Sequence, residues 1–328
     1  MKNKPFLLKP SGKDYLWGGT RLRDDFSKDI PITPFAEAWE CSTHPAGDST
    51  VASGQFQGQK LVDVLRAHSE LVGSHPECKN GEIPILVKLI DAKKNLSVQV
   101  HPDDQYAYTH ENGQRGKTEM WYVVDALPGT KLIYGFHRDI SKEELRRYAE
   151  DGTIEKYLQS VEIKKNDVFL IQPGTVHAIG AGALIAEIQE SSNLTYRLYD
   201  YNRIDKNGKK RELHISKALD VANLKAVNTP RQPIRVLKYR PGFASELLCR
   251  CRYFQVERLL INTERIRTMY SFHIGSSSFE VILCIDGCGV FFFDQEMIPF
   301  FKGDTIFIPA DSTEIKVHGQ ASLLRVNC

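Results

Sequence analysis

The chain has 328 residues, enough for one large fold or for two of modest size. Its 43 Lys and Arg residues nearly balance its 41 Asp and Glu residues, and a net charge of +2 provides no broad basic surface for nucleic acid or an anionic membrane. Hydrophobic residues make up 41% and charged residues 26%, which is typical of a globular protein and excludes a disordered one. No run approaches 18 consecutive apolar residues, so we expect no transmembrane helix.

The beginning of the chain and the cysteines indicate the compartment. The apolar run at residues 6–8 is too short for the core of a signal peptide, and we therefore expect a cytoplasmic protein. Seven cysteines are an odd number, which does not suit a secreted disulfide framework. The two close pairs, Cys249 with Cys251 and Cys284 with Cys288, lack four-ligand zinc spacing, so we interpret the cysteines as reduced thiols.

Strand patterns outnumber helix patterns in the first two thirds of the chain. An apolar stripe at helical spacing predicts a helix over residues 59–71. Short apolar, β-branched runs bounded by Gly, Pro, Asp or Asn predict antiparallel strands at 83–90, 120–124, 131–136, 168–172 and 184–189. A capping box at Ser141 predicts a helix that continues to residue 157 with a break at Gly152. Residues 212–224 form the last expected helix.

A change in composition divides the chain. Residues 226–243 are rich in Pro, and the helix patterns stop before them. The tail shows only strand patterns, at 254–261, 279–285, 290–293, 305–308 and 322–326. We therefore predict two domains, residues 1–235 and a smaller unit at 236–328.

The two parts share a faint internal repeat. A strand that begins with Glu at 119–125 resembles residues 280–286, and a turn–Asp–strand–Pro unit at 166–173 resembles residues 303–309. Two β-barrels of one type would produce this pattern. Where the first unit then carries a histidine, the second carries a threonine.

Candidate metal ligands lie at the ends of separate predicted strands. Gln99 and His101 are two residues apart and so share one face of a strand, Glu119 opens the next strand, and His177 follows a Pro-Gly turn. Two imidazoles, a carboxylate and a nearby amide oxygen suit Zn²⁺ with an open position, and the first three also suit Fe(II). The alternative is two hydrogen-bonded loop histidines and a salt-bridged strand end, and spacing alone leaves both interpretations open.

Two cations accompany this set. Lys117 precedes Glu119 by two residues and faces the same side of an extended chain, and Arg197 alternates with apolar neighbours. A metal with inward-pointing Lys and Arg favours an anionic, oxygen-rich ligand such as a sugar phosphate. Neither GxxxxGK[ST] nor GxGxxG after a strand occurs, which disfavours nucleotide hydrolysis and dinucleotide redox chemistry.

Other polar residues carry weaker signals. His44 is interpreted as structural or as part of a pocket rim, and His137 and His214 as ordinary histidines. The basic run at 209–211 is interpreted as a solvated turn beside Asn207. In the tail, three residues stand where a second metal site would lie, and we expect that site to be empty because the third is not a ligand: His273, Glu280 and Thr313.

The combined motifs resemble those of the type I mannose-6-phosphate isomerases in their short bacterial form. Matching stretches occur in the family's order and spacing at 15–19, 36–42, 96–104, 116–122, 173–180 and 187–200, whereas the tail from about residue 243 is only loosely similar. The resemblance implies an all-β dominated fold, a tandem cupin of two jelly-roll β-barrels with a few helices added to the N-terminal catalytic part. The longer members carry an additional helical domain for which this chain has no room.

The resemblance also implies roles for the candidate residues. His101, Glu119 and His177 correspond to ligands of one Zn²⁺ per chain, Gln99 to a less certain fourth, Arg197 to an active-site residue, and Lys117 to a lysine that reaches the substrate. The implied reaction interconverts D-mannose 6-phosphate and D-fructose 6-phosphate by proton transfer through a cis-enediol. Zinc-bound hydroxide, Lys117 and a pocket carboxylate remain candidates for the general base.

Two other functions stay open on the sequence. One is another metal-dependent cupin enzyme, an Fe(II) oxygenase or a sugar-nucleotide epimerase, and the other is a non-enzymatic sugar-binding cupin module. The expected partner is a small sugar phosphate, with no nucleic acid and no membrane. The absence of heptads favours a monomer or a weak homo-oligomer.

Overall fold

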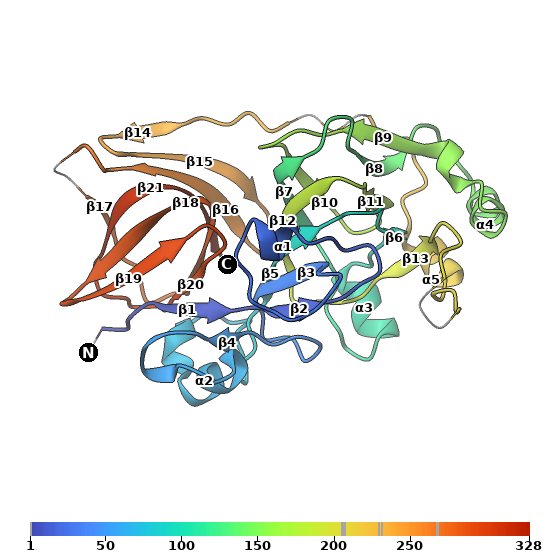
Figure 1. Cartoon of the computed structure of the whole chain (residues 1–328). Coiled ribbons are helices and arrows are strands. Elements are labelled where there is room, and N and C mark those ends of the chain that lie inside the picture. Colours follow the sequence, from blue (N-terminus) through green and yellow to red (C-terminus); the bar gives the residue numbers. More distant parts are fainter. Residues whose placement is uncertain (1, 205–207, 229, 231, 267–268) are drawn as a thin grey trace.

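Two β-rich lobes lie side by side in the computed structural model, which describes residues 2–204, 208–228, 230, 232–266 and 269–328. The strands of the C-terminal third form most of one lobe, and most strands and helices of the preceding residues form the other (Figure 1). Asn207 of the expected turn and positions 229 and 231 of the predicted linker lie outside the described residues.

Two antiparallel sheets face each other in the first lobe. The six-stranded sheet has the order β10-β7-β12-β5-β3-β2. Its strands are β2 (Ser11–Lys13), β3 (Glu37–Cys41), β5 (Ile85–Asp91), β7 (Glu119–Ala126), β10 (Val168–Ile171) and β12 (Ala183–Glu190). The five-stranded sheet has the order β13-β6-β11-β8-β9. Its strands are β6 (Val98–Val100), β8 (Lys131–Phe136), β9 (Leu158–Glu162), β11 (His177–Ile179) and β13 (Tyr196–Tyr199).

A ten-stranded antiparallel sheet forms the second lobe and closes around its own apolar core. Its main path runs β14-β15-β16-β21-β18-β20-β1-β4, with β17 on β21 and β19 on β18. The strands are β1 (Phe6–Lys9), β4 (Thr50–Val51), β14 (Lys238–Arg240), β15 (Phe243–Arg250), β16 (Gln255–Asn262), β17 (Tyr270–Phe272), β18 (Glu280–Phe293), β19 (Glu296–Phe301), β20 (Thr305–Ile308) and β21 (Ile315–Asn327).

The helices are short and lie outside the sheets. Most of them belong to the first lobe, where α4, η3 and α5 pack on the outer face of the five-stranded sheet. The helices are α1 (Arg21–Asp24), η1 (Gly54–Phe56), α2 (Leu61–Ala67), η2 (Ser69–Val72), α3 (Asp104–His110), α4 (Lys142–Glu150), η3 (Ile154–Tyr157) and α5 (Ile215–Val221). Among the described residues, no helix is both long enough and apolar enough to cross a membrane.

The six-stranded sheet is buried on both faces, and this decides which side chains reach the interior of the first lobe. All eight residues of β12 are buried. Leu184, Ala186 and Ile188 pack into the core shared with the second lobe, whereas Ile185 packs between the two sheets of the first lobe. Since successive side chains point to opposite faces, Glu187 shares the inner face with Ile185.

The all-β dominated architecture with a few helices is confirmed, and most expected elements are present. The capping box forms between Ser141 and Glu144, and the helix ends at Glu150 before a separate 3₁₀ turn. The patterns at 279–285 and 290–293 belong to one long strand, β18. The helix expected over 212–224 is shorter, because α5 begins at Ile215 and the backbone is already extended at Ala222.

The chain's first strand belongs to the second lobe. Phe6 of β1 lies opposite Phe307 of β20, and β4 continues the same sheet. The predicted division after residue 235 stays a prediction. The topology adds that N-terminal residues complete the sheet of the C-terminal strands.

Candidate metal centre and adjoining cavity

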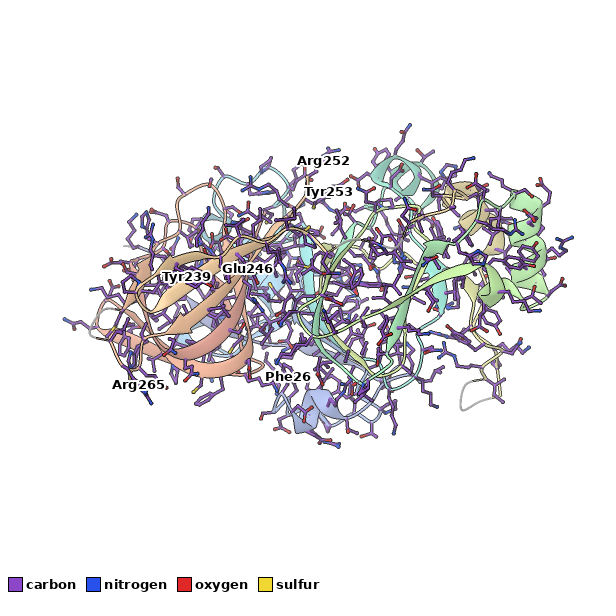
Figure 2. All side chains as sticks on the ribbon, turned by 90° about the horizontal axis from the view of Figure 1, so that it is seen from above. Phe26, Tyr239, Glu246, Arg252, Tyr253 and Arg265 are labelled. Atoms are coloured by element: carbon purple, nitrogen blue, oxygen red, sulfur yellow. The ribbon has the colours of Figure 1, made fainter. Side chains whose placement is uncertain are left out.

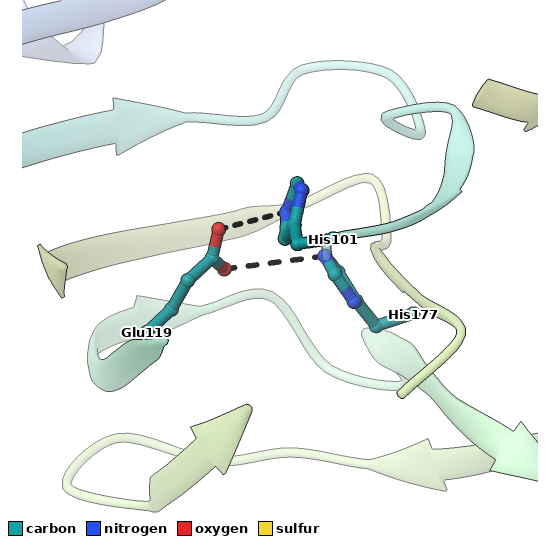
Figure 3. A group of neighbouring side chains, drawn as sticks. All are labelled: His101, Glu119 and His177. Carbon is teal, nitrogen blue, oxygen red and sulfur yellow. Dashed lines mark ion pairs between the residues drawn. The ribbon is translucent and has the colours of Figure 1, made fainter. Parts of the chain in front are cut away.

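Three residues from three strand ends meet between the two sheets of the first lobe. His101 follows β6, Glu119 opens β7, and His177 opens β11. Each is at most 1% exposed, and one ligand atom from each lies within 4.8 Å of the others. Figure 3 shows both imidazoles directed toward the Glu119 carboxylate. Within the described ranges this is the one such group of three or more His, Cys, Asp or Glu side chains.

The hydrogen bonds around the group orient its ligand atoms. His177 Nδ1 lies 2.8 Å from the carbonyl oxygen of Thr175 and donates to it, which leaves the Nε2 lone pair facing the group. His101 Nε2 is 2.9 Å from Glu119 Oε1, and His177 Nε2 is 3.9 Å from Glu119 Oε2. The indole N–H of Trp121 donates to Glu119 Oε2 over 3.0 Å. Glu119 Oε1 accepts no well-directed hydrogen bond although it is buried.

The protonation states suit a cation. Burial lowers the pKa of His101 to about 3, helped by the charge of Lys117, and burial also lowers the pKa of His177. Burial opposes ionisation of Glu119, but Lys117 and the histidines hold its pKa well below the usual range. Two neutral imidazoles and a carboxylate are the donor set of open transition-metal sites, so the residues present fit a divalent metal.

The other sequence candidates lie beside this group. Lys117 Nζ is 2.5 Å from Glu119 Oε1 and 3.4 Å from His101 Nε2. Gln99 pairs with His177 across β6 and β11, and its Nε2 lies 3.4 Å from His177 Nε2. The structure therefore brings together Gln99, His101, Lys117, Glu119 and His177.

A cavity of about 240 Å³ adjoins the group. Polar and charged side chains make up much of its wall, together with apolar and aromatic ones. The lining residues are Tyr15, Trp17, Glu37, Lys88, Ile90, Leu96, Ser97, Gln99, Lys117, Trp121, Ile179, Glu187, Asn193, Thr195, Arg197 and Arg211.

One wall of the cavity carries a buried charge network. Lys88 Nζ lies 3.4 Å from Glu187 Oε1 and 3.8 Å from Glu37 Oε2. Burial opposes the charge of Lys88, but Glu187 and Glu37 raise its pKa above the ordinary value. Burial and the charge of Glu119 raise the pKa of Glu187 to about 7, against the opposing effect of Lys88. A cavity carboxyl group whose pKa is raised by burial and a neighbouring charge is a candidate for acid–base chemistry.

The opposite wall is cationic. Arg197 donates through Nη1 to the Glu212 carbonyl over 2.7 Å, and its buried Nε has no hydrogen-bond partner. Arg211 Nε donates to Asp200 Oδ2 over 2.8 Å, and Arg203 pairs with the same carboxylate. Two guanidinium groups therefore share the Asp200 carboxylate and Arg197 has no carboxylate partner, which leaves positive charge available to an anion.

The structure corrects one interpretation and refines two others. The expectation of a solvated turn at 209–211 is wrong for Arg211, because Asp200 holds it at the cavity wall. His214 immediately precedes α5, and its Nδ1 accepts the Arg197 N–H over 3.2 Å. His44 packs edge-on against Trp39 and borders a different cavity.

The residues proposed as remains of a second metal site have other contacts. Glu280 accepts two hydrogen bonds of 2.6 Å each from the Arg325 guanidinium. Thr313 donates to Asp294 over 2.7 Å. His273 is exposed.

Sequence reasoning missed Lys88, Glu187 and Glu37 as cavity residues. Each lies within an apolar strand, and Lys88 and Glu187 face each other directly across β5 and β12. A charged side chain inside a strand that is buried on both faces needs a partner of opposite charge. The presence of these charged residues within apolar runs could therefore have indicated a buried polar site.

The fold and the site together define a class: two cupin-type β-barrel lobes with a His–Glu–His group beside a charged cavity in the first. Residues 6–124 match the family model described as phosphomannose isomerase type I, catalytic domain, and residues 246–328 match that of the mannose-6-phosphate isomerase cupin domain.

Individual relatives agree over two thirds or more of the chain. The mannose-6-phosphate isomerase ManA of Bacillus subtilis is 37% identical over 333 residues, covering 99% of each chain. That of Streptococcus mutans is 44% identical over 221 residues, 67% of this chain and 68% of its own. The crystal structure of a mannose 6-phosphate isomerase from Bacillus subtilis superposes with a TM-score of 0.90 at 35% identity, covering 99% of this chain and 100% of its own. The chain belongs to the type I mannose-6-phosphate isomerase family, and the resemblance, the fold class and the enzyme class are confirmed.

We expect one equivalent of a divalent transition metal to bind the chelator-treated protein and to raise its Tm, because binding to the folded state alone stabilises it. His177→Ala should abolish stoichiometric binding by removing one of three ligands. His273→Ala is the matched control, since His273 is exposed and distant from the group in the sequence. Metal analysis after gel filtration and thermal melts measure both effects. Full metal content in His177→Ala would contradict this assignment.

Proposed function

We propose that this chain is a zinc-dependent aldose–ketose isomerase that interconverts D-mannose 6-phosphate and D-fructose 6-phosphate through a cis-enediol. The observation that carries the proposal is the shared location of the His101–Glu119–His177 group and the charged cavity. Membership of the isomerase family supports the substrate. We extend the proposal to a cytoplasmic monomer or weak homo-oligomer, as the sequence predicts.

The donor set supports zinc as the resident metal, one ion per chain. Two imidazole nitrogens and a carboxylate would hold it, with Gln99 as the candidate fourth ligand because its amide lies beside His177. When bound, the metal would act as a Lewis acid for negative charge that develops on the oxygens of the sugar's first two carbons. Lys117, buried against Glu119, would add a positive charge at the same place.

Proton transfer between the first two carbons requires a base, and we propose Glu187. Its carboxyl group lines the cavity, is buried, and is not needed as a ligand of the three-residue group. A base whose pKa lies near the working pH is present in its deprotonated form often enough to act and is still basic enough to take the proton. Lys88, 3.4 Å away, would stabilise the carboxylate after it releases the proton.

Glu187→Gln should lower kcat by about two to four orders of magnitude, because the amide cannot accept the proton. The variant should keep its metal content, which separates this effect from loss of the site. Glu37→Gln, on the same wall, is the matched control and should lose much less, because Glu37 already accepts the Trp39 indole N–H. Deuterium uptake from solvent at the second carbon reports the step directly. Exchange at the wild-type rate in Glu187→Gln would assign the base elsewhere.

The two cavity arginines have different positions, and we propose different roles. Arg197 pairs with Gln99 across β13 and β6, so it lies next to the metal group and would stabilise enediolate charge. Arg211 lies on the segment after β13, held by Asp200, and would bind the phosphate at the far end of the sugar.

Arg197→Ala should reduce kcat far more than it raises KM, as expected for an interaction that strengthens in the transition state. Arg211→Ala should raise KM about tenfold or more and weaken competitive inhibition by inorganic phosphate, with a smaller change in kcat. Arg66→Ala, an exposed arginine, serves as the control. If Arg197→Ala changed KM alone, Arg197 would be a binding residue. If inhibition by phosphate were unchanged in Arg211→Ala, Arg211 would not be the residue that binds the phosphate.

The function itself is tested with chelator-treated protein on mannose 6-phosphate. Fructose 6-phosphate is converted to glucose 6-phosphate and read through NADPH formation, before and after addition of Zn²⁺. Activity that returns only with metal is the expected result. Folded protein without activity in Zn²⁺, Fe²⁺, Mn²⁺ or Co²⁺ would contradict the isomerase and favour a sugar-binding module, whereas activity with a metal other than Zn²⁺ would correct the cofactor alone.

A further inference from the structure

A tyrosine of the second lobe contacts the loop that carries the candidate metal ligands of the first. Tyr253 lies in the turn between β15 and β16, where Cys251 N–H bonds to the Phe254 carbonyl. Phe254, 2% exposed, fixes this turn in the apolar core between the lobes. Figure 2 shows Arg252 and Tyr253 where the two lobes meet. The Tyr253 hydroxyl donates to Asp104 Oδ2 over 2.8 Å.

Asp104 also contacts residues 116–119, the segment that ends with the candidate ligand Glu119. It lies three residues after His101, in the first turn of α3, and its Oδ1 accepts the Gly116 N–H over 2.9 Å. Lys117 N–H adds a bond to the Pro102 carbonyl at 3.0 Å. A Cβ on Gly116 would lie 2.5 Å from the backbone of Asp103 and Asp104, so the two segments are in direct backbone contact. The segments that carry His101 and Glu119 are therefore fastened to each other at Asp104.

A second carboxyl group, that of Glu190, contacts the same segment. Glu190, at the end of β12, accepts the Thr118 N–H over 2.7 Å and donates its own backbone N–H to the Thr118 carbonyl over 3.1 Å. Burial and the nearby charge of Asp104 raise the pKa of Glu190 to about 7. Burial opposes the charge of Asp104, yet the bonds from Tyr253 and Gly116 hold its pKa below the usual value. The ionised Asp104 thus accepts hydrogen bonds from Tyr253 through one carboxylate oxygen and from Gly116 through the other.

We propose that Tyr253 is a positioning residue for the isomerase site. Through its bond to Asp104, Tyr253 holds Lys117 and Glu119 in place. This inference rests on the proposed metal site and gives the second lobe a role beyond covering apolar surface. The hydroxyl makes the bond to Asp104, so Tyr253→Phe removes that bond and keeps the aromatic ring at the apolar interface. Residues that fix the orientation of metal ligands commonly change metal affinity or activity by one to two orders of magnitude when they are lost.

The test compares Tyr253→Phe with Tyr239→Phe, an exposed tyrosine of the same lobe. Hydrogen exchange of the metal-free proteins is measured first, on peptides that contain Gly116 and Thr118. Faster exchange of these amides in Tyr253→Phe is expected, because a charged hydrogen-bond acceptor loses one of its donors. The affinity for Co²⁺, followed by its visible absorption, should fall about tenfold. The kcat should also fall, whereas KM should stay within about twofold of the wild-type value.

A double-mutant cycle with Asp104→Asn shows whether the effect runs through that carboxylate. Tyr253→Phe should add little to Asp104→Asn. If Tyr253→Phe leaves amide exchange, Co²⁺ affinity and kcat at their wild-type values, or if its effect adds fully to Asp104→Asn, the inference is overturned. Failure of the proposed function is distinguishable, because the wild-type protein would then bind no metal or show no isomerase activity, while the exchange measurement on metal-free protein still reports the contact.

Discussion

The six-stranded sheet of the first lobe has no solvent-facing side, and the rest of the structure depends on that constraint. One face packs against the second lobe, and the other faces the five-stranded sheet and the cavity. Every polar side chain on the inner face must therefore find a partner inside the protein. In β5, β7 and β12 the inner face alternates apolar residues with charged ones, which places Lys88, Glu119 and Glu187 in one buried layer.

Charge compensation follows from this burial. Three carboxylates, Glu37, Glu119 and Glu187, face two lysines, Lys88 and Lys117, across short distances. Isolated buried charges are costly, so each member of the network depends on the others. A divalent cation at the histidine group and a doubly charged sugar phosphate at the arginines would add equal and opposite charge. Binding of both, as proposed, would leave the net charge of the cavity unchanged.

The two lobes are joined by an apolar core and by specific polar contacts at its edge. The core combines Val87, Leu89 and Ile188 of the first lobe with Val256 and Leu324 of the second. Such burial is non-directional and holds the lobes together without orienting a ligand. The Tyr253–Asp104 bond is directional, and Asp104 in turn accepts the N–H of Gly116, three residues before Glu119. This contact is the basis for the proposed influence of the second lobe on the site in the first.

The sequence by itself determined the β-rich class, the main strands and the residues at strand ends. Period-two alternation and the capping box at Ser141 are local patterns, so they can be predicted without knowledge of tertiary contacts. His101, Glu119 and His177 were recognised because their residue types and the motifs around them resemble a known family. Their meeting within 4.8 Å of each other is a property of the fold.

Only the tertiary structure decided which other residues share the cavity. Lys88 and Glu187 are 99 residues apart and meet because β5 and β12 are neighbours in one sheet, which no local pattern encodes. Arg211 looked solvated because its neighbours are basic and polar, and it reaches the cavity only because Asp200 holds it there. Tyr253 gave no signal at all, since its partner Asp104 is 149 residues away in the other lobe. Short-range patterns report burial and secondary structure, whereas pairing between distant strands and lobes depends on the packing of the whole chain.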